Sequence, residues 1–323
     1  MRAIEVTEHG DASVLQETER DRPTPESNEV LIEVAAAGIN FADIQQRMGI
    51  YPGGPSPPFI PGFEVAGTIV ETGADSSLEP GTMVASICPG GGYAEYTVAE
   101  AGSVFPIPPA LSAAEAVAIP VQFLTAHGCL FDRGGLGAGE RVLIHAAAGG
   151  VGSAAVQLAA NADAEVFGTA SSEEKLEHAR GLGCDHPINY EVQSFADVIN
   201  DITGGDGIDL IIDGVGGDTF RESLDCLAHF GRIVTMGAST GEPARPNTAK
   251  LLVNNQQVIG FHLGNTLARN PERALTPLDE LLSSLADGEL EVVIGGRVDL
   301  DEAGSAHSFI EDRSSRGKII LEP

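Results

Sequence analysis

Residues 141–152 read R-V-L-I-H-A-A-A-G-G-V-G, and this stretch decides the fold. The apolar run at 142–144 is typical of a buried strand, and the alanine-rich segment 153–160 after the glycine turn favours a helix. In such a strand–turn–helix, glycines let the backbone approach a pyrophosphate. The helix N-terminus offers free N–H groups and the positive end of its dipole. The stretch therefore predicts a dinucleotide-binding unit.

The motif on its own leaves other interpretations open. A G-x-G-x-x-G pattern would place a glycine at Ala147, and only Gly149 and Gly152 fit it. A packing turn without a ligand has the same appearance. A membrane span over 142–162 is a further alternative, but polar residues such as His145 and the central glycines argue against it.

Length and charge narrow the class of protein. The 323 residues suggest two domains, each large enough for its own core. Dispersed acidic residues, 47 against 18 basic ones, give a net charge of −29, which repels nucleic acid and anionic membranes. We expect a halophilic, salt-adapted protein whose self-repulsion is screened by counterions.

The termini and cysteines indicate a cytoplasmic protein without a structural metal. The N-terminal stretch 1–5 is charged and lacks the apolar core of a signal peptide, so we expect a soluble, cytoplasmic chain without a membrane span. Cys88, Cys129, Cys184 and Cys226 are isolated and form no C-x-x-C pair. We therefore expect them to be buried small hydrophobes.

The secondary-structure pattern of the sequence changes near residue 124. Residues 1–123 are rich in strand patterns and in glycine and proline breaks, whereas 124–261 alternate between apolar strands and helices. This alternation predicts an α/β fold with a doubly wound parallel sheet of the Rossmann type, covered by helices on both faces. Helices are expected at 219–228 in this unit and at 275–286 in the tail. The tail 262–323 is expected to pack back onto the first, β-rich domain.

The segment after the second strand of this unit bears on the cofactor. NAD-binding folds place an acid there to bond the ribose 2′-OH, and this chain has Ser171 and Ser172, with Lys175 close behind. Those side chains suit a 2′-phosphate, so NADPH is favoured over NADH. The same residues also form a capping box, Ser171-x-x-Glu174, and the charge of Glu173 would oppose a phosphate.

Other residues at strand ends are candidates for the same ligand. Tyr190 either lies against the adenosine phosphate or is a half-exposed residue at a strand end. Turns after the predicted strands should meet at the carboxyl edge of the sheet. The residues expected to bind cofactor from these turns are Ala148, Gly149, Gly150, Val151, Gly152, Gly214, Val215 and Gly237.

Several segments taken together resemble a known family. They read AGINFAD at 37–43, RMGIYP at 47–52, PGFEVAG at 61–67, GGYAEY at 91–96 and AAAGGVG at 146–152, followed by EK at 174–175 and INY at 188–190. In this order they resemble the zinc-free quinone oxidoreductase family of the medium-chain dehydrogenase/reductase superfamily, whose members include zeta-crystallin-like proteins. The resemblance covers nearly the whole chain.

The resemblance implies a GroES-like β-rich catalytic domain beside the Rossmann domain, and no zinc. Zinc-dependent relatives have a Gly-His-Glu where this chain has Phe63 between Gly62 and Glu64, and the cysteine ligand expected near Asn40 is absent. Glu64 is then expected to be a local structural hydrogen-bonding residue.

The resemblance also implies the chemistry. We expect hydride transfer from the nicotinamide C4 to a quinone or enone, controlled by positioning. Asn40, which is also a candidate helix N-cap, and Thr125 are expected beside the nicotinamide, with Tyr51 as a further catalytic residue. Phe261, His262 and Leu263 are expected near the same ring. Gln45 stands where many relatives have a tyrosine, which leaves the acceptor open.

The sequence leaves two alternative functions open. An enoyl-thioester reductase would need a basic patch, for which Arg245, Arg269 and Arg273 are the loose cluster available. A non-catalytic, crystallin-like NADPH-binding protein is a third possibility. The resemblance implies a homodimer, with residues 258–261 as a plausible seam, since an uncovered edge strand tends to pair.

Overall fold

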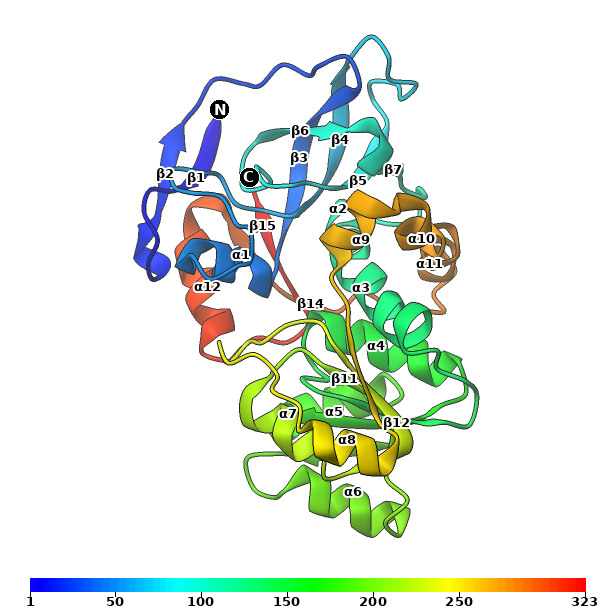
Figure 1. The fold of residues 1–323 in the computed structure, drawn as a ribbon. Helices are drawn as coiled ribbons and strands as arrows, with labels where there is room; N and C mark the ends of the chain where they lie inside the picture. The colour runs from blue at the N-terminus through cyan, green and yellow to red at the C-terminus, as the bar shows by residue number, and fades with distance from the viewer. The chain divides into compact units, whose positions relative to one another are not determined.

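The computed structural model describes all residues from 1 to 323 and divides into two compact units (Figure 1). Unit 1 contains Met1–Val121 and Asp279–Pro323, and unit 2 contains Gln122–Leu278. Residues 262–278, which we expected in the first domain, cluster with unit 2. Here α9 (Leu263–Arg269) packs on α10 (Pro271–Leu275), and Arg273 of α10 pairs with Asp132 of the same unit.

Unit 1 is built on a seven-stranded sheet. Its strand order is β14-β15-β3-β4-β5-β7, with β6 also paired to β3, while β1 and β2 form a separate hairpin. The elements before the chain leaves the unit are β1 (Arg2–Val6), η1 (Ala12–Val14), β2 (Leu15–Glu19), β3 (Glu29–Ile39), α1 (Phe41–Met48), β4 (Glu64–Thr72), β5 (Met83–Ile87), β6 (Tyr96–Glu100), η2 (Ala101–Ser103), β7 (Val104–Pro106) and α2 (Ala113–Ala116). Those after it returns are α11 (Leu278–Ala286), β14 (Ile294–Asp299), η5 (Leu300–Glu302), α12 (Ala303–Glu311) and β15 (Lys318–Glu322).

The long strand β3 organises the core of unit 1. Its apolar residues are almost all buried, and they divide between two clusters. Val30, Ile32 and Val34 join the larger cluster, and Ala36 joins a smaller one that includes Ile320 of β15. Because β15 pairs with β3 in antiparallel register, the last strand of the chain completes the core that the first residues begin.

Unit 2 is a doubly wound sheet of six parallel strands in the order β10-β9-β8-β11-β12-β13. This is the strand order of dinucleotide-binding folds. Its elements are α3 (Leu124–His127), η4 (Gly128–Arg133), β8 (Arg141–Ile144), α4 (Gly150–Asn161), β9 (Glu165–Ala170), α5 (Glu173–Gly181), β10 (His186–Asn189), α6 (Phe195–Thr203), β11 (Ile208–Asp213), α7 (Gly217–Ser223), β12 (Leu227–Thr235), α8 (Thr248–Asn254) and β13 (Gln257–Gly260), followed by α9 and α10.

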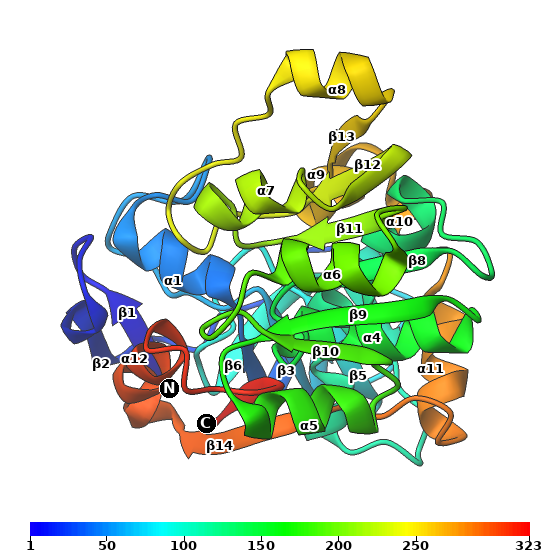
Figure 2. The ribbon, with the colours of Figure 1, turned by 90° about the horizontal axis from the view of Figure 1, so that it is seen from below.

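Helices flank the sheet of unit 2, and this explains its continuous apolar strands (Figure 2). Leu143 and Phe167 pack in one cluster with Phe195 of α6 and Phe220 of α7. Their neighbours along the strands point to the opposite face, and Val142 among them is fully buried as well. Both faces are therefore covered, as the sequence pattern predicted.

Two expected helices have different limits in the structure. A helix expected over 219–228 ends at Ser223, and β12 already begins at Leu227. A helix expected from Leu275 begins at Leu278 as α11, because α10 ends at Leu275 and Pro277 interrupts the chain between them.

One helical run has the length and apolar character of a membrane-crossing helix. It extends from Ala113 to Arg133, and it includes the π-turns at Ile119–Phe123 (η3) and Gly128–Arg133. Of its most apolar window, 72% is buried inside the protein, which is the behaviour of a core helix.

Candidate cofactor and active site

The predicted cofactor residues of unit 2 gather at the carboxyl edge of its sheet. The strand β8 ends at Ile144, which lies in register with Ile212 near the end of β11 on one side and with Gly168 near the end of β9 on the other. The strands β10, β12 and β13 also end at this edge. In parallel sheets this edge is the usual place for a ligand.

The glycine turn shapes the middle of this edge. Gly149 is the N-cap of the twelve-residue helix α4, which begins at Gly150. A Cβ at Gly152 would collide with the carbonyl of Ala146, and one at Gly150 would collide with the Gln122 amide. Packing against backbone therefore requires glycine at position 152, whereas at position 150 the Gln122 side chain would have to move.

Gly149 has a different reason to be glycine. Its φ is −77°, which any residue adopts, and a Cβ there would meet only the Ala146 oxygen, at 3.2 Å. The N–H groups in the first turn of α4 have no helical carbonyl partner. A shallow cradle with free N–H groups at a helix N-terminus fits a pyrophosphate, so this part of the site suits a dinucleotide.

The segment after β9 begins helix α5 one residue later than the capping box predicted. Ser172, not Ser171, is the N-cap, and its Oγ accepts from Lys175 N at 3.4 Å. Ser171 precedes the cap, and both serines are half-buried. The alternative role as a helix cap thus falls to Ser172, which leaves the side chain of Ser171 outside the capping interaction.

The remaining strand ends complete this edge. The backbone N–H of Tyr190 bonds to Ala170 O at 3.3 Å, just past β10. After β11, Oδ1 of Asp213 accepts from Val215 N and Gly216 N, at 3.0 and 3.1 Å, and so holds the turn that contains Gly214. Buried Oδ2 of the same carboxyl has no partner, and burial raises the pKa of Asp213. Gly237 follows β12, and Phe261, His262 and Leu263 follow β13.

Thr125 lies on a helix that contacts this region. It is half-buried on α3, two residues after Phe123, in the run that also carries Gln122. The Gln122 amide lies against Gly150, and the Phe261 ring lies against Gly128 one turn beyond Thr125. Gln122 could not be identified from the sequence, because its contact is with Gly150, 28 positions away.

The buried side chain of His145, just before the glycine turn, holds neighbouring elements together. His145 Nδ1 lies 2.9 Å from Thr169 Oγ1, and His145 Nε2 lies 2.8 Å from Ser223 Oγ. Ser223 Oγ donates to Thr219 O at 2.7 Å, so it accepts from Nε2. Burial lowers the pKa of His145 to about 3, and the ring is therefore neutral. It joins the ends of β8 and β9 to α7.

Asn40 is the N-cap residue of α1 in unit 1, as the sequence predicted. Its backbone N–H donates to Asp43 Oδ2 at 2.8 Å, and Gly62 N donates to Oδ1 of the same carboxyl at 3.1 Å. Burial raises the pKa of Asp43 to about 7 despite these two bonds. Asp43 therefore ties the start of α1 to the loop before β4.

The Asn40 side chain belongs to a buried ionic cluster that the sequence did not predict. Its Nδ2 donates to Glu64 Oε1 at 2.8 Å, and its Oδ1 accepts from Lys318 Nζ at 2.9 Å. Lys318 also pairs with Glu64, and both side chains are fully buried. The second Glu64 oxygen accepts from Val121 N at 2.9 Å. Glu64 is thus not the local hydrogen-bonding residue that we expected, since its main partner is 254 positions away.

A single signal in the sequence could have identified Lys318. It is one of only three lysines, with Lys175 and Lys250, and it begins an apolar strand. A buried lysine requires a carboxylate partner, but the sequence does not indicate which of 47 acids provides it. Gly38 leaves the necessary space, because a Cβ there would collide with the Lys318 side chain.

Tyr51 lies near the same cluster in unit 1. Its ring centroid is 5.5 Å from that of Phe63, the residue that replaces the histidine of zinc-dependent relatives. Burial, with the Asp43 carboxylate, raises the pKa of the Tyr51 phenol. No group of three or more His, Cys, Asp or Glu side chains in this structure could hold a metal ion.

A second buried polar chain extends to the surface from Tyr93, whose phenol is hydrogen-bonded to Asp43. Tyr93 OH lies 3.0 Å from His307 Nε2, and Arg47 Nη1 donates to His307 Nδ1 at 3.4 Å. Arg47 also binds Glu311 through two bonds of 2.8 and 3.0 Å. Burial, with the charge of Arg47, lowers the pKa of His307 to about 3. These contacts fix α12 against α1.

Unit 1 also contains a pocket of about 450 Å³ next to α1. Pro58, Phe59 and Ile60 give it apolar walls, and Gln46 of α1 contributes a polar group. The Gln46 side chain is 4% exposed, and its Oε1 has no hydrogen-bond partner. The pocket can therefore accommodate an apolar ring, while the Gln46 oxygen is buried in its wall and the Glu5 carboxylate also lines the pocket.

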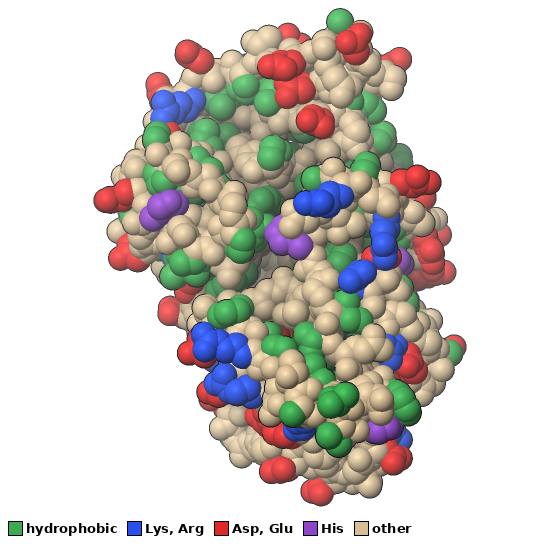
Figure 3. Space-filling view, viewed as in Figure 1, with side chains coloured by type: hydrophobic (Ala, Val, Ile, Leu, Met, Phe, Trp, Pro, Cys, Tyr) green, Lys and Arg blue, Asp and Glu red, His purple; other side chains and the backbone are tan.

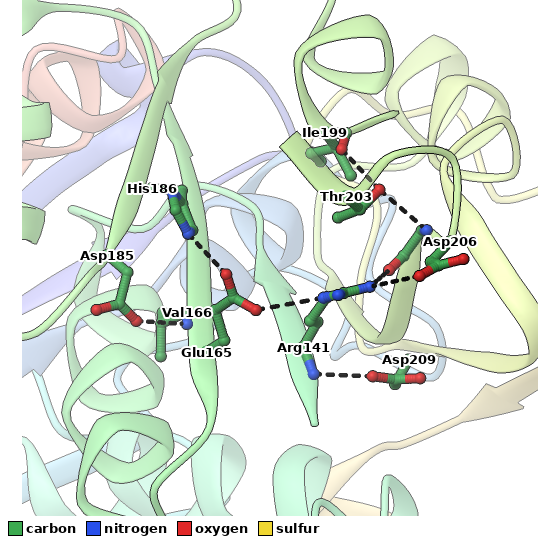
Figure 4. Close-up of polar contacts among 10 residues, drawn as sticks. Arg141, Glu165, Val166, Asp185, His186, Ile199, Thr203, Asp206 and Asp209 are labelled. Carbon is green, nitrogen blue, oxygen red and sulfur yellow. Dashed lines mark hydrogen bonds and ion pairs between the residues drawn. The ribbon is translucent and has the colours of Figure 1, made fainter. Parts of the chain in front are cut away.

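The amino edge of the sheet in unit 2 is occupied by paired charges (Figure 4). Glu165 lies between His186 and Arg141, with contacts of 2.8 and 3.2 Å. Arg141 N donates to Asp209 Oδ2, and Val166 N donates to Asp185 Oδ2, at 2.9 and 2.8 Å. These bonds join the starts of adjacent strands and satisfy one another, so this edge is structural.

Comparisons with known proteins agree with this geometry. The model described as "Alcohol dehydrogenase GroES-like domain" matches residues 26–109, and "Zinc-binding dehydrogenase" matches 150–283. The chain is 32% identical to the quinone oxidoreductase of Mus musculus, over 99% of this chain and 97% of that protein.

Two solved structures have the same fold over almost the whole chain. The quinone oxidoreductase of Escherichia coli complexed with NADPH has a TM-score of 0.94 and 32% identity, and the match covers 100% of both chains. The CurK enoyl reductase has a TM-score of 0.89 and 30% identity, with 99% of this chain and 98% of that one covered.

Proposed function

We propose that this chain, which belongs to the quinone oxidoreductase-like proteins of the medium-chain dehydrogenase/reductase superfamily, is a cytoplasmic, zinc-independent NADPH:quinone or enone reductase. The observation that carries the proposal is the carboxyl edge of unit 2. There the Gly149 cradle, the Ser171–Lys175 segment and the turns after β11, β12 and β13 follow neighbouring strands of one sheet. This arrangement suits an extended dinucleotide.

The cofactor would be held by named groups of unit 2. The α4 N-terminus would receive the pyrophosphate, and Ser171, Ser172 and Lys175 would receive the 2′-phosphate. Thr125 and the residues 261–263 would contact the nicotinamide end. When bound, NADPH supplies the hydride that the acceptor takes up.

In unit 1 we propose that Asn40 provides orientation and that Tyr51 provides a proton. Asn40 is held by Glu64 and Lys318 on opposite ends of its amide, so its side chain cannot rotate freely. A conjugated carbonyl gains negative charge on oxygen as it is reduced, and a nearby donor stabilises that charge. The Tyr51 phenol, whose pKa is raised by burial and by Asp43, stays protonated at neutral pH and can donate there.

Zinc-independence rests on the residues that stand at the ligand positions. Phe63 has no metal-binding atom, and the Asn40 amide is already engaged by Lys318 and Glu64. Neither residue is a ligand that zinc selects. Dialysis against a chelator should therefore leave turnover with NADPH unchanged.

Lys175→Ala tests the preference for NADPH. Loss of the ammonium should weaken NADPH about tenfold and leave NADH nearly unchanged, because the two cofactors differ only in the 2′-phosphate. Affinities are measured by titration of both cofactors in the same buffer. Lys250→Ala is the matched control, since Lys250 pairs with Asp225 on another face of the unit. Equal weakening of both cofactors by Lys175→Ala would contradict a 2′-phosphate role.

Turnover tests the reaction class. The purified protein in molar salt is given NADPH with a small 1,4-benzoquinone or with a small enone, and loss of absorbance at the reduced nicotinamide is followed. Oxidation with either acceptor supports the proposal. Tight NADPH binding without any oxidation would contradict it and would favour a non-catalytic binding protein.

The edge of unit 2 also supports a homodimer. The strand β13 pairs only with β12, so one of its edges is open. Phe230, Leu252 and Val253 near it are 67%, 80% and 74% exposed, and α8 contacts β12. Light scattering should give twice the 33.4 kDa chain mass, and Phe230→Glu with Val253→Glu should give the monomer. A monomeric wild type would contradict this assignment.

A further inference from the structure

Free basic side chains are rare in this chain. Its 18 Lys and Arg residues face 47 acids, and almost all of them lie in ion pairs or other polar contacts. Arg133, Arg245 and Arg269 are the exceptions, since no carboxylate lies within ion-pair distance of them. Each of these arginines reduces the net self-repulsion of the chain, but its guanidinium has no carboxylate partner within the protein.

Two of these three arginines line one pocket in unit 2. The pocket measures about 280 Å³ and is bordered by Arg133 at the end of η4, Arg269 at the end of α9 and Arg273 of α10. Blue side chains gather over α9 and α10 in Figure 3, and a second blue group lies at the lower left of the same view. Arg245 lies outside the pocket, although the sequence grouped it with Arg269 and Arg273.

The charges of the pocket do not cancel. Asp132 is its one acidic residue, and it accepts from Arg273 Nε at 2.7 Å. This leaves Arg133 and Arg269 in the same hollow without an acidic partner. A planar guanidinium matches the oxygens of a phosphate with paired hydrogen bonds, so the two side chains suit a bound anion.

The neighbouring polar groups hold the pocket in shape. Asn270 Oδ1 accepts from Arg273 N at 3.1 Å, and His262 Nδ1 accepts from Asn265 N at 3.1 Å. Thr266 Oγ1 donates to His262 O at 3.0 Å. These bonds fix the starts of the two short helices that carry the arginines. The pocket is therefore built into the fold of unit 2.

The pocket is separate from the place expected for the cofactor's own 2′-phosphate. The latter follows β9, whereas the pocket follows β13, and β8, β11 and β12 lie between those strands. Neighbouring strands are about 4.8 Å apart, so the two places are separated by roughly 19 Å. The pocket shares Phe261 and His262 with the proposed nicotinamide end of the cofactor site, and that end carries no phosphate monoester. A phosphate monoester in the pocket would consequently belong to a second ligand.

We propose that the pocket formed by Arg133, Arg269 and Arg273 binds a phosphate group, either free or as the phosphate monoester of a substrate arm. This goes beyond the proposed hydride transfer, which needs no charged acceptor. The phosphate lies between Arg133 and Arg269, while Arg273 remains paired with Asp132. A substrate with such an arm gains affinity from a contact away from the reacting carbonyl.

Direct binding tests the proposal without depending on turnover. The full chain, saturated with NADPH to fill the cofactor site, is titrated by calorimetry with 4′-phosphopantetheine, with pantetheine and with inorganic phosphate. Arg133→Ala/Arg269→Ala is compared with Arg245→Ala, which removes an equally unpaired arginine elsewhere. Circular dichroism confirms that both variants are folded.

The expected result is that 4′-phosphopantetheine binds to the wild type at least tenfold more tightly than pantetheine does. The double variant should lose that difference, and Arg245→Ala should keep it. Inorganic phosphate that binds as tightly as 4′-phosphopantetheine supports a site for the free ion, and much weaker phosphate supports a substrate arm. Equal binding of pantetheine and 4′-phosphopantetheine, or an unchanged double variant, would overturn the proposal. A failure of quinone turnover would leave this result unaffected.

Discussion

Lys318 shows how much a single buried charge depends on its partners. Its ammonium contacts Glu64 and Asn40 in a space that Gly38 leaves open, and no water-exposed alternative exists because the side chain is fully buried. Removal of one member of a buried ion pair leaves the other charge without compensation. The lysine is therefore needed for the stability of unit 1 as well as for the orientation of Asn40.

Lys318→Met should destabilise the protein by about 3–5 kcal/mol, because Glu64 would stay buried without a cation. Denaturant unfolding at constant salt measures the change. Lys250→Met is the control, since its pair with Asp225 is exposed and should be worth less than about 1 kcal/mol. Adding Glu64→Gln to Lys318→Met should recover part of the loss. An effect as small as that of Lys250→Met would show that the buried pair is not needed.

At the scale of residues, the sequence predicted features such as helix caps, which depend on neighbouring positions. The Asn40–Asp43 spacing predicted a helix start, and the structure confirms it. The cap of α5 was placed one residue too early, because Ser171 and Ser172 are equally good caps and only the path of the chain after β9 selects between them. The Lys318–Glu64 pair could not be predicted, since nothing near either residue encodes a partner 254 positions away.

At the scale of elements, the turn from β8 to α4 depends on a histidine in its neutral form. His145 joins Thr169 at the end of β9 to Ser223 of α7, and both contacts use the ring nitrogens of a neutral imidazole. Protonation would place a charge in a dry interior. Acid should therefore weaken the hydrogen bonds of His145, which hold the start of the glycine turn in place.

Stability should fall as the pH decreases from 7 to 5, partly through His145. Its pKa is lowered from 6.5 to about 3 in the fold, so its contribution is complete above pH 6.5 and is lost as acid protonates the unfolded chain. Each proton that only the unfolded chain binds adds about 1.4 kcal/mol per pH unit to the slope of the unfolding free energy against pH. His307 acts in the same direction, whereas Asp43, with a raised pKa of about 7, loses its contribution as the pH rises.

His145→Gln isolates the histidine from these other groups. Unfolding free energies are measured for both proteins at several values between pH 5 and 7. The unfolding free energy of the variant should depend less steeply on pH, by the equivalent of about one proton. Its stability at pH 7 separately measures the packing that the substitution removes. Parallel curves for the two proteins would contradict a buried neutral His145.

Elements with strong patterns were predicted well, and those limited by packing were not. The strand at 142–144, its glycine turn and α4 follow directly from apolar and glycine positions. The end of α7 at Ser223 was missed, because Leu224 and Cys226 are buried and continue an apolar pattern through the turn into β12. Burial of a turn removes the polar signal that normally marks it.

At the scale of the whole molecule, the acidic surface should make stability depend on salt. A charge of −29 repels itself, and the Debye length decreases from about 10 Å at 0.1 M to about 3 Å at 1 M salt. The melting temperature should therefore rise by several degrees between 0.1 and 2 M KCl. Sucrose, which does not screen charge, is the control. Equal melting temperatures throughout the KCl series would exclude salt adaptation.

The composition predicted the acidic surface, and the alternation of strands and helices predicted the Rossmann architecture. The boundary between the two units depends instead on tertiary contacts. Residues 262–278 carry no pattern that assigns them to either unit. Their place in unit 2 follows from contacts with the rest of that unit, such as the pair between Arg273 and Asp132, which are 141 positions apart. Such contacts depend on the folded path of the chain and have no local signature.

The discontinuous composition of unit 1 has a consequence for synthesis on the ribosome. Glu64 emerges with the first segment, but its cation Lys318 is 254 positions later, after all of unit 2. At about 5–20 residues per second, this interval lasts roughly 13 to 50 s. During that time the uninterrupted segment Gln122–Leu278 can already fold, whereas the core around β3 lacks its last strand. The part of the chain made first is thus completed last, and its exposed apolar strands are the ones a chaperone would need to protect.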